Sequence, residues 1–245
     1  MLKKITFYLV LITFLSSCFT SGTKKTAEKT DDNDSIIVVK KPFKTNPKKI
    51  EYEISILKGT NKRHGLQKRF YPHGSLYSEI DYLMNKRVGV AKTYYQAFGG
   101  KKPQVWKEQP YTNGKLDGTC RRYHKNGQLQ AEYVYKMGLP GLGLKEFTNK
   151  GVPVKQPKLI LSSKKKKGFI EITAKMSNKA KKVKYFAGFL VDGKYVSKNM
   201  KELEVKNGVG RLLIPITATK RFENITAVAS TRYYNKLIVT GTIKY

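Results

Sequence analysis

Alternating apolar and polar residues, interrupted by turns that contain glycine, recur through the middle of the chain. Alternation on both sides of such a turn predicts a strand, a turn and a second strand. The pattern starts anew at Gly65, Gly89, Gly118 and Gly141, which are separated by 24, 29 and 23 residues. Spacing of this kind is typical of a repeat protein. Because one hairpin cannot bury its own apolar side, we expect the hairpins to lie side by side in one long antiparallel sheet.

Two Asn-Gly pairs mark candidate turns in this sheet. Asn126–Gly127 divides the third unit and fits a two-residue type I′ turn, which needs two positive φ angles. Asn113–Gly114 fits the return turn between the second and third units. The second unit carries an insertion with Trp106, a candidate binding loop, and the fourth unit lacks its closing aromatic residue.

Two of the units, GLQKRFYPHGSLYSEIDY and GTCRRYHKNGQLQAEYVY, resemble the MORN-repeat variant family. Its bacterial members are often labelled YwqK-type antitoxins. The resemblance covers roughly residues 59–154. It implies a sheet of stacked β-hairpins and, through the family label, the neutralisation of a co-encoded toxin as one candidate function.

Aromatic residues occupy matching places in successive units, and two explanations stay open for them. One is ladder packing between neighbouring strands. The other is a stripe that binds a protein partner, because Tyr and Trp are favoured anchors in interfaces. The candidate partner-binding residues are Tyr71, Tyr82, Tyr95, Trp106, Tyr111, Tyr123 and Tyr135.

The last ninety residues follow a different rhythm. Beyond Pro153 and Pro157 the glycine spacing stops, and six or seven short apolar runs are separated by turn signals such as Asp192–Gly193 and Asn207–Gly208. This pattern predicts an immunoglobulin-like β-sandwich over residues 156–245, without a disulfide because no cysteine pair is present. The expected fold class is therefore all-β, with the hairpin repeats at 49–155 followed by the sandwich.

The N-terminus predicts export and lipid attachment. Lys3 and Lys4 precede an apolar run of 11 residues, Ile5–Leu15, which is too short to span a membrane and is typical of a signal peptide. Leu15-Ser16-Ser17-Cys18 resembles the bacterial lipobox, which implies cleavage between Ser17 and Cys18 and a lipid on Cys18. An ordinary secretory signal is the alternative. Residues 1–17 are then the signal peptide and 18–48 a flexible tether, in which 36–39 is a candidate short strand.

By resemblance to such lipoproteins, the protein is expected in the bacterial cell envelope, held to a membrane by its lipid. Phe19 follows the cysteine, where some inner-membrane lipoproteins carry aspartate, so the outer membrane is favoured over the inner. The sequence leaves open whether the protein faces the periplasm or the cell surface.

The formal net charge of +32 favours contact with polyanions such as acidic lipids and anionic glycans. Solvated charges without a partner are the alternative. Lysine is the poorer residue for planar, bidentate recognition, and lysines predominate here, so specific nucleic-acid binding is not expected. We expect a hairpin loop at 164–167 and further lysines near the next loop to form a basic rim. Its candidate polyanion-binding residues are Lys164, Lys165, Lys166, Lys167, Lys181, Lys182 and Lys184.

Catalytic motifs are missing from the sequence. The three histidines have no companions at metal-binding spacing, and the seventeen acidic residues are scattered without a suitable carboxylate pair. Cys120 fits a half-buried position in the sheet. We therefore expect no enzyme activity, no metal and no cofactor. The favoured function is a membrane-anchored interaction scaffold for a protein partner, with an antitoxin and a binder of envelope glycan or lipopolysaccharide as alternatives.

Overall fold

The structure is a computed structural model that describes residues 35–217, 219 and 221–245. This part of the chain folds into nineteen β-strands and contains no helix, so the all-β prediction is confirmed. Accordingly, none of the described residues belongs to a helix that is long and apolar enough to cross a membrane. The predicted signal peptide, the lipid on Cys18 and the first part of the tether lie outside the described residues.

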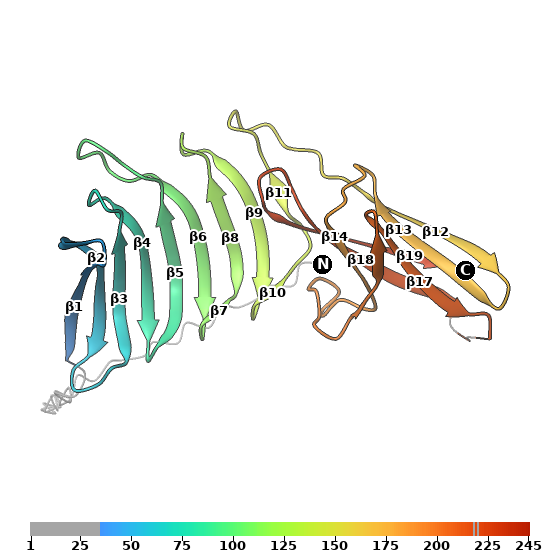
Figure 1. Cartoon of the computed structure of the whole chain (residues 1–245), viewed down its shortest axis with the longest axis horizontal. Helices are drawn as coiled ribbons and strands as arrows, with labels where there is room; N and C mark the ends of the chain where they lie inside the picture. Colours follow the sequence, from blue (N-terminus) through green and yellow to red (C-terminus); the bar gives the residue numbers. More distant parts are fainter. Residues whose placement is uncertain (1–34, 218, 220) are drawn as a thin grey trace, which may run out of the picture. The chain divides into compact units, whose positions relative to one another are not determined.

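Eleven of the described strands form one antiparallel sheet, which we call the repeat sheet (Figure 1). Strands that follow one another in sequence are neighbours in the order β1-β2-β3-β4-β5-β6-β8-β9-β10, while β7 also pairs with β6 and β11 with β9. The predicted sheet of side-by-side hairpins is therefore confirmed. The strands are β1 (Ile36–Phe43), β2 (Asn46–Leu57), β3 (Arg63–Phe70), β4 (Leu76–Leu83), β5 (Lys86–Tyr94), β6 (Val105–Thr112), β7 (Lys115–Leu116), β8 (Gly118–Tyr123), β9 (Leu129–Lys136), β10 (Leu139–Pro140) and β11 (Lys145–Glu146).

The sheet begins earlier than the sequence indicated, because β1 and the start of β2 fall within the expected tether, 18–48. The expected short strand at 36–39 is the first half of β1. Val39 pairs with Ile54 of β2, and Ile36 pairs with Leu57, so the apolar residues of β1 extend the sheet over two buried positions. This pairing explains why the segment forms a strand.

Return turns between the units share one geometry. Asn113–Gly114 is the predicted return turn, and its φ angles of +50° and +80° fit type I′. Met84–Asn85 and Met137–Gly138 also have two positive φ angles. In all three turns the amide of the second residue donates to a carbonyl of the preceding unit, at 2.9, 2.9 and 2.7 Å. The turns therefore link successive units along one end of the strands.

The turn at Asn126–Gly127 differs from the prediction. Gly127 has φ +86°, but Asn126 is not among the residues with positive φ, so a type I′ turn is wrong here. The His124 amide donates to the Gln128 carbonyl at 2.8 Å, and the Gly127 amide donates to the His124 carbonyl at 2.9 Å. These bonds close a three-residue loop, in which a tight turn is followed by a left-handed glycine. Its extra residue gives the register shift between β8 and β9.

Each of the first three repeat glycines lies opposite a tyrosine of the neighbouring strand. Gly65 pairs with Tyr82, Gly89 with Tyr111 and Gly118 with Tyr135. All three glycines have positive φ, between +66° and +112°, which side chains disfavour. The repeated Gly and Tyr thus occupy paired positions in neighbouring strands.

The remaining described strands form two four-stranded antiparallel sheets, with orders β12-β13-β17-β16 and β15-β14-β18-β19. In chain order the eight strands correspond to A, B, C, C′, D, E, F and G. The two sheets then have the orders A-B-E-D and C′-C-F-G, the arrangement of an immunoglobulin-like sandwich. Asp192–Gly193 and Asn207–Gly208 form turns as predicted. The strands are β12 (Leu159–Lys166), β13 (Phe169–Met176), β14 (Val183–Ala187), β15 (Lys201–Glu202), β16 (Glu204–Lys206), β17 (Val209–Pro215), β18 (Phe222–Ser230) and β19 (Lys236–Lys244).

The sandwich core is continuous with the last strands of the repeat sheet. Ile172, Tyr185 and Ile225, from three different strands, are fully buried together. Ala131 of β9 and Leu144, before β11, belong to the same buried cluster. Burial of apolar area is the main stabilising term in folding, so the end of the repeat sheet is stabilised by the sandwich.

Candidate functional site

One face of the repeat sheet carries an alternating row of charges, which we call the charge row. Strand pairing places these residues directly opposite one another from β1 to β11, and opposite charges in such pairs are stabilising. Ion pairs within it join Lys40 to Glu53 at 3.6 Å and Arg121 to Glu132 at 3.2 Å. Four of the seventeen acidic residues share this row, and each lies opposite basic residues. Its members, in strand order, are Lys40, Glu53, Lys68, Glu79, Lys92, Glu108, Arg121, Glu132 and Lys145.

Aromatic side chains at the loop end of each hairpin hold the next hairpin. The Tyr71 hydroxyl donates to the Tyr94 carbonyl at 3.0 Å, and the Tyr95 hydroxyl donates to the Tyr123 carbonyl at 2.8 Å. His124 Nε2 repeats the contact, 2.9 Å from the Phe147 carbonyl. Side chains at equivalent positions thus form a ladder from unit to unit.

A second contact joins the aromatic ladder to the charge row. The Tyr123 hydroxyl donates to Glu108 Oε2 at 2.8 Å, and Tyr94 donates to Glu79 Oε2 at 2.5 Å. Burial and the hydrogen bond to Glu108 raise the pKa of Tyr123 to about 12. Burial and the bond to Glu79 likewise raise the pKa of Tyr94. These tyrosines therefore stay protonated at neutral pH and act as donors within the sheet.

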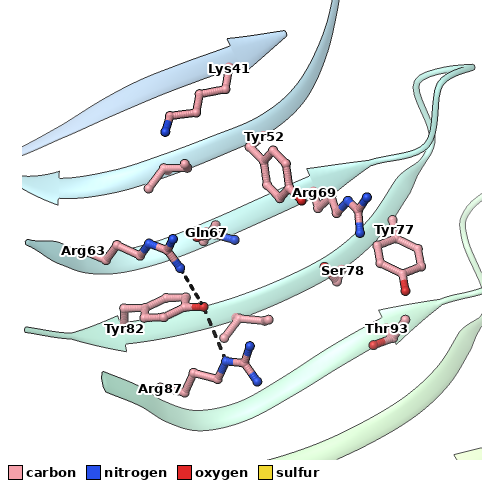
Figure 2. A pocket seen from close by; sticks show the side chains of 12 residues that line it. Lys41, Tyr52, Arg63, Gln67, Arg69, Tyr77, Ser78, Tyr82, Arg87 and Thr93 are labelled. Carbon is pink, nitrogen blue, oxygen red and sulfur yellow. Dashed lines mark hydrogen bonds between the residues drawn. The ribbon is translucent and has the colours of Figure 1, made fainter. Parts of the chain in front are cut away.

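The opposite face of the repeat sheet contains a groove of about 440 Å³. Figure 2 shows side chains from five neighbouring strands, β1 to β5, pointing into it. Ile54 and Ile80 supply apolar lining, and Tyr82 is only 5% exposed. We call this the arginine groove, because its cations include Arg63, Arg69 and Arg87, besides Lys41.

Arg63 and Arg87 converge on a single tyrosine hydroxyl (Figure 2). Arg63 Nη1 donates to Tyr82 Oη at 3.3 Å, and Arg87 Nε donates to the same oxygen at 3.5 Å. Arg87 Nη1 also donates to Tyr111 Oη at 3.3 Å. Hydrogen bonds to the two tyrosines raise the pKa of Arg87, so this guanidinium stays charged.

The arginines of the groove differ in how their charges are balanced. Arg69 donates from Nη2 to Glu51 Oε1 at 2.8 Å and from Nε at 3.1 Å. Among the residues that the structure describes, no ion pair forms to Arg63, Arg87 or Lys41. Because each guanidinium has five N–H donors, the two arginines keep donors for a further acceptor. The groove can therefore bind an anion.

The predicted tyrosines lie in two structural settings. Tyr82, Tyr111 and Tyr135 lie opposite the repeat glycines, while the other three belong to the aromatic ladder. All six make hydrogen bonds or ring contacts within the sheet, which agrees with ladder packing. Binding of a partner by these six residues stays a prediction.

Trp106 is not part of the insertion loop, because it lies within β6. Its ring is 3.7 Å from Lys107 Nζ and 5.5 Å from the Arg122 guanidinium. The inserted residues before β6 expose Phe98, whose ring stacks on His73 with centroids 4.6 Å apart. The insertion therefore packs on the loop of the preceding hairpin, and its exposed aromatic residue is Phe98.

The lysines of the predicted basic rim do not lie together. Lys164, Lys165 and Lys166 belong to β12, so the turn is Lys167–Gly168 instead of the predicted four-residue loop. Lys181 and Lys182 follow the other end of β13, and eight strand residues span about 26 Å. Lys166 is paired to Glu171 at 2.7 Å, and Lys184 to Glu202 at 2.9 Å. The structure thus has two basic ends instead of one rim.

The arginines of the groove were missed in the sequence, although a signal was present. Arg63 precedes Gly65 by two residues, and Arg87 precedes Gly89 by two residues. The repeated Arg-x-Gly places both arginines at equivalent positions of neighbouring units. In the third unit Leu116 takes this position, so the pair is confined to the first two units.

The buried cysteine and the junction with the sandwich show no reactive centre. Cys120 is fully buried, and burial raises the pKa of its thiol to about 11. Arg122 donates to Asn235 Oδ1 at 2.7 Å, and Asn235 donates to the buried Glu146 at 2.6 Å, which joins the sheet to the sandwich. Over the described ranges, no three His, Cys, Asp or Glu side chains are grouped so that they could hold a metal ion.

Comparison with known families gives one similarity. The MORN repeat variant family matches residues 63–83 and 116–137, which contain the β3–β4 and β8–β9 hairpins. No curated protein and no solved structure matches the chain. Families with MORN repeats are generally non-catalytic binding modules. Two hairpins of the repeat sheet are therefore similar to MORN repeat variants, a repeat with a role in protein interaction or binding.

Proposed function

We propose that the protein is a non-catalytic scaffold of the bacterial envelope, anchored by a lipid on Cys18, whose repeat sheet binds a protein partner on its groove face. One observation carries this proposal: the acids and ladder aromatics bond within the sheet, whereas Arg63 and Arg87 have no carboxylate partner among the described residues. Charged groups held in place without a counter-ion favour an interface with a partner of opposite charge.

Cross-linking in living cells tests this proposal. The tagged lipoprotein is captured from membranes after cross-linking, and the captured proteins are identified by mass spectrometry. The double variant Arg63→Gln/Arg87→Gln should lose the partner, while Arg121→Gln, an exposed arginine of the charge row, should retain it. Capture of the same protein by all three chains would reject the groove face, and capture of one small toxin would favour the antitoxin alternative.

The anchor has its own test. Metabolic labelling with a palmitate analogue should modify the wild-type chain and leave Cys18→Ser unlabelled and released from membranes. Labelling of Cys18→Ser would contradict the lipid attachment.

Binding of anionic glycan or lipid is a second candidate, supported by the two basic ends of the sandwich. Exposed lysines near an anionic surface contribute attraction that weakens with salt. Retention on anionic vesicles should fall when Lys164, Lys165 and Lys167 are changed to Gln. Unchanged retention would leave that end of the sandwich without a role in binding.

A further inference from the structure

We propose that the arginine groove is a carboxylate-binding site, which takes an acidic side chain from an extended, partly apolar peptide segment of the partner. This inference rests on the proposed function and names the chemistry that the groove recognises. The carboxylate would lie between Arg63 and Arg87, above the hydroxyl of Tyr82, and would receive charge-assisted hydrogen bonds from both guanidinium groups.

The two arginines are arranged for a shared acceptor. Both lie within 3.5 Å of Tyr82 Oη, although they are on β3 and β5 with β4 between them. Two like charges held this close repel each other, and a bound anion removes the repulsion. Tyr82 is buried and fixes the two guanidinium groups, whereas both arginines are exposed to an incoming ligand.

One arginine that lines the groove, Arg69, already binds a carboxylate. Arg69 lies near the rings of Tyr52 and Tyr77, at 5.3 and 5.1 Å from their centroids, and both its Nε and Nη2 donate to Glu51. Arg87 has similar aromatic contacts, 5.3 Å from the Tyr111 ring, but no carboxylate. The Arg69–Glu51 pair thus shows that a carboxylate is a suitable partner for an arginine in this setting.

The lining favours a peptide over a highly charged polymer. Ile54 and Ile80 line the groove between the cations, so a ligand must bring apolar groups beside its charge. Arg63 and Arg87 belong to strands two apart, about 10 Å, which one or two acidic side chains of an extended peptide can span. Arginine is also the residue that matches a planar carboxylate with two parallel hydrogen bonds.

Fluorescence anisotropy with the detergent-solubilised full chain tests this site. The probe is a fluorescein-labelled peptide of alternating Glu and Leu, and its partner probe replaces each Glu by Gln. Wild type should bind the Glu peptide, with affinity that falls as salt rises. It should bind the Gln peptide at least roughly tenfold more weakly. Arg63→Gln and Arg87→Gln should each weaken Glu-peptide binding by about tenfold, while Arg121→Gln should leave it unchanged.

Further variants distinguish recognition from folding. Arg87→Lys keeps the charge and loses the planar fork, so its affinity should lie between wild type and Arg87→Gln, and thermal unfolding should show that the variants are folded. Equal binding of the Glu and Gln peptides, equal binding by the double variant, or stronger competition by polyphosphate than by free Glu peptide would overturn the assignment. The peptides could fail to bind while the double variant still loses its cellular partner. That result would support partner binding on the groove face and reject only the recognition of a carboxylate.

Discussion

Reversing the charge of Glu108 tests whether the charge row stabilises the repeat sheet. Glu108 lies in register between Lys92 and Arg121, and its Oε2 accepts the Tyr123 hydroxyl at 2.8 Å. Glu108→Lys therefore turns two opposite-charge pairs into two like-charge pairs. The substitution also removes the carboxylate that accepts the tyrosine hydroxyl.

The size of the effect follows from these contacts. A cross-strand pair of opposite charge contributes roughly 0.2–1 kcal/mol and a like-charge pair costs a similar amount, so the two pairs together change by roughly 1–4 kcal/mol. The lost hydrogen bond to a charged acceptor adds roughly 1.5–3 kcal/mol. The Arg121 side chain is 46% exposed, which weakens the charge contribution. We expect Glu108→Lys to lower the free energy of unfolding by about 3 kcal/mol at low salt.

Urea denaturation followed by circular dichroism, at low and high salt, measures this loss. Changing both Lys92 and Arg121 to Gln should restore stability in the Glu108→Lys chain but should reduce it in wild type. Glu108→Gln is the control, because it keeps an acceptor for Tyr123 and removes only the charge. A loss below roughly 0.5 kcal/mol, the usual effect of a surface substitution, would show that the charge row does not stabilise the sheet. The same conclusion would follow if neutralising Lys92 and Arg121 changed the free energy of unfolding in the same direction in both chains.

Three further predictions concern the glycine repeat, the buried phenols and the thiol. Gly118→Ala places a new Cβ 3.1 Å from a proline side chain at φ +112°, so it should reduce the free energy of unfolding by about 2 kcal/mol. Gly99→Ala, at φ +63° with nothing within 4 Å, should reduce it by about 1 kcal/mol. Equal losses in urea denaturation would count against a special role of the repeat glycine. Because the pKa of Tyr123 is raised from 10.0 to about 12, the unfolded chain releases this proton first, and stability should fall as pH rises from 10 to 12. Tyr123→Phe should make that fall shallower, and an unchanged pH profile would contradict the assignment. Cys120 is fully buried, so a thiol reagent should leave it unmodified in native Cys18→Ser protein and modify it in urea; rapid labelling of the native chain would show that the site opens.

Local features of the sequence carried the prediction of the two folded parts. The glycine spacing and the alternation of apolar residues report strands and turns directly, and they identified both the repeat sheet and the sandwich. Turn type was less accessible, because the same Asn-Gly pair forms a type I′ turn at Asn113–Gly114 and the end of a three-residue loop at Asn126–Gly127. The difference lies in which residues pair across the turn, and the dipeptide does not determine that.

Features that depend on strand register were not accessible from one unit alone. The charge row joins residues of nine strands, and Glu79 and Glu108 are recognisable as equivalent only after each strand is aligned with its neighbour. The basic rim was wrong for a similar reason, because the strand between Lys167 and Lys181 carries the two groups to opposite ends of the sandwich. The convergence of Arg63 and Arg87 on Tyr82 likewise needs the pairing of β3, β4 and β5.

Site-specific photo-cross-linking tests most directly whether the groove face of the repeat sheet binds a protein partner. A photo-reactive amino acid is placed at Thr93, which lines the arginine groove, or at Leu66, which is exposed on the charge-row face. We expect a cross-linked protein from position 93 and none from position 66, with the product lost in the Arg63→Gln/Arg87→Gln chain. Cross-linking from position 66 alone, or a product from position 93 that survives loss of both arginines, would contradict binding of the partner on the groove face.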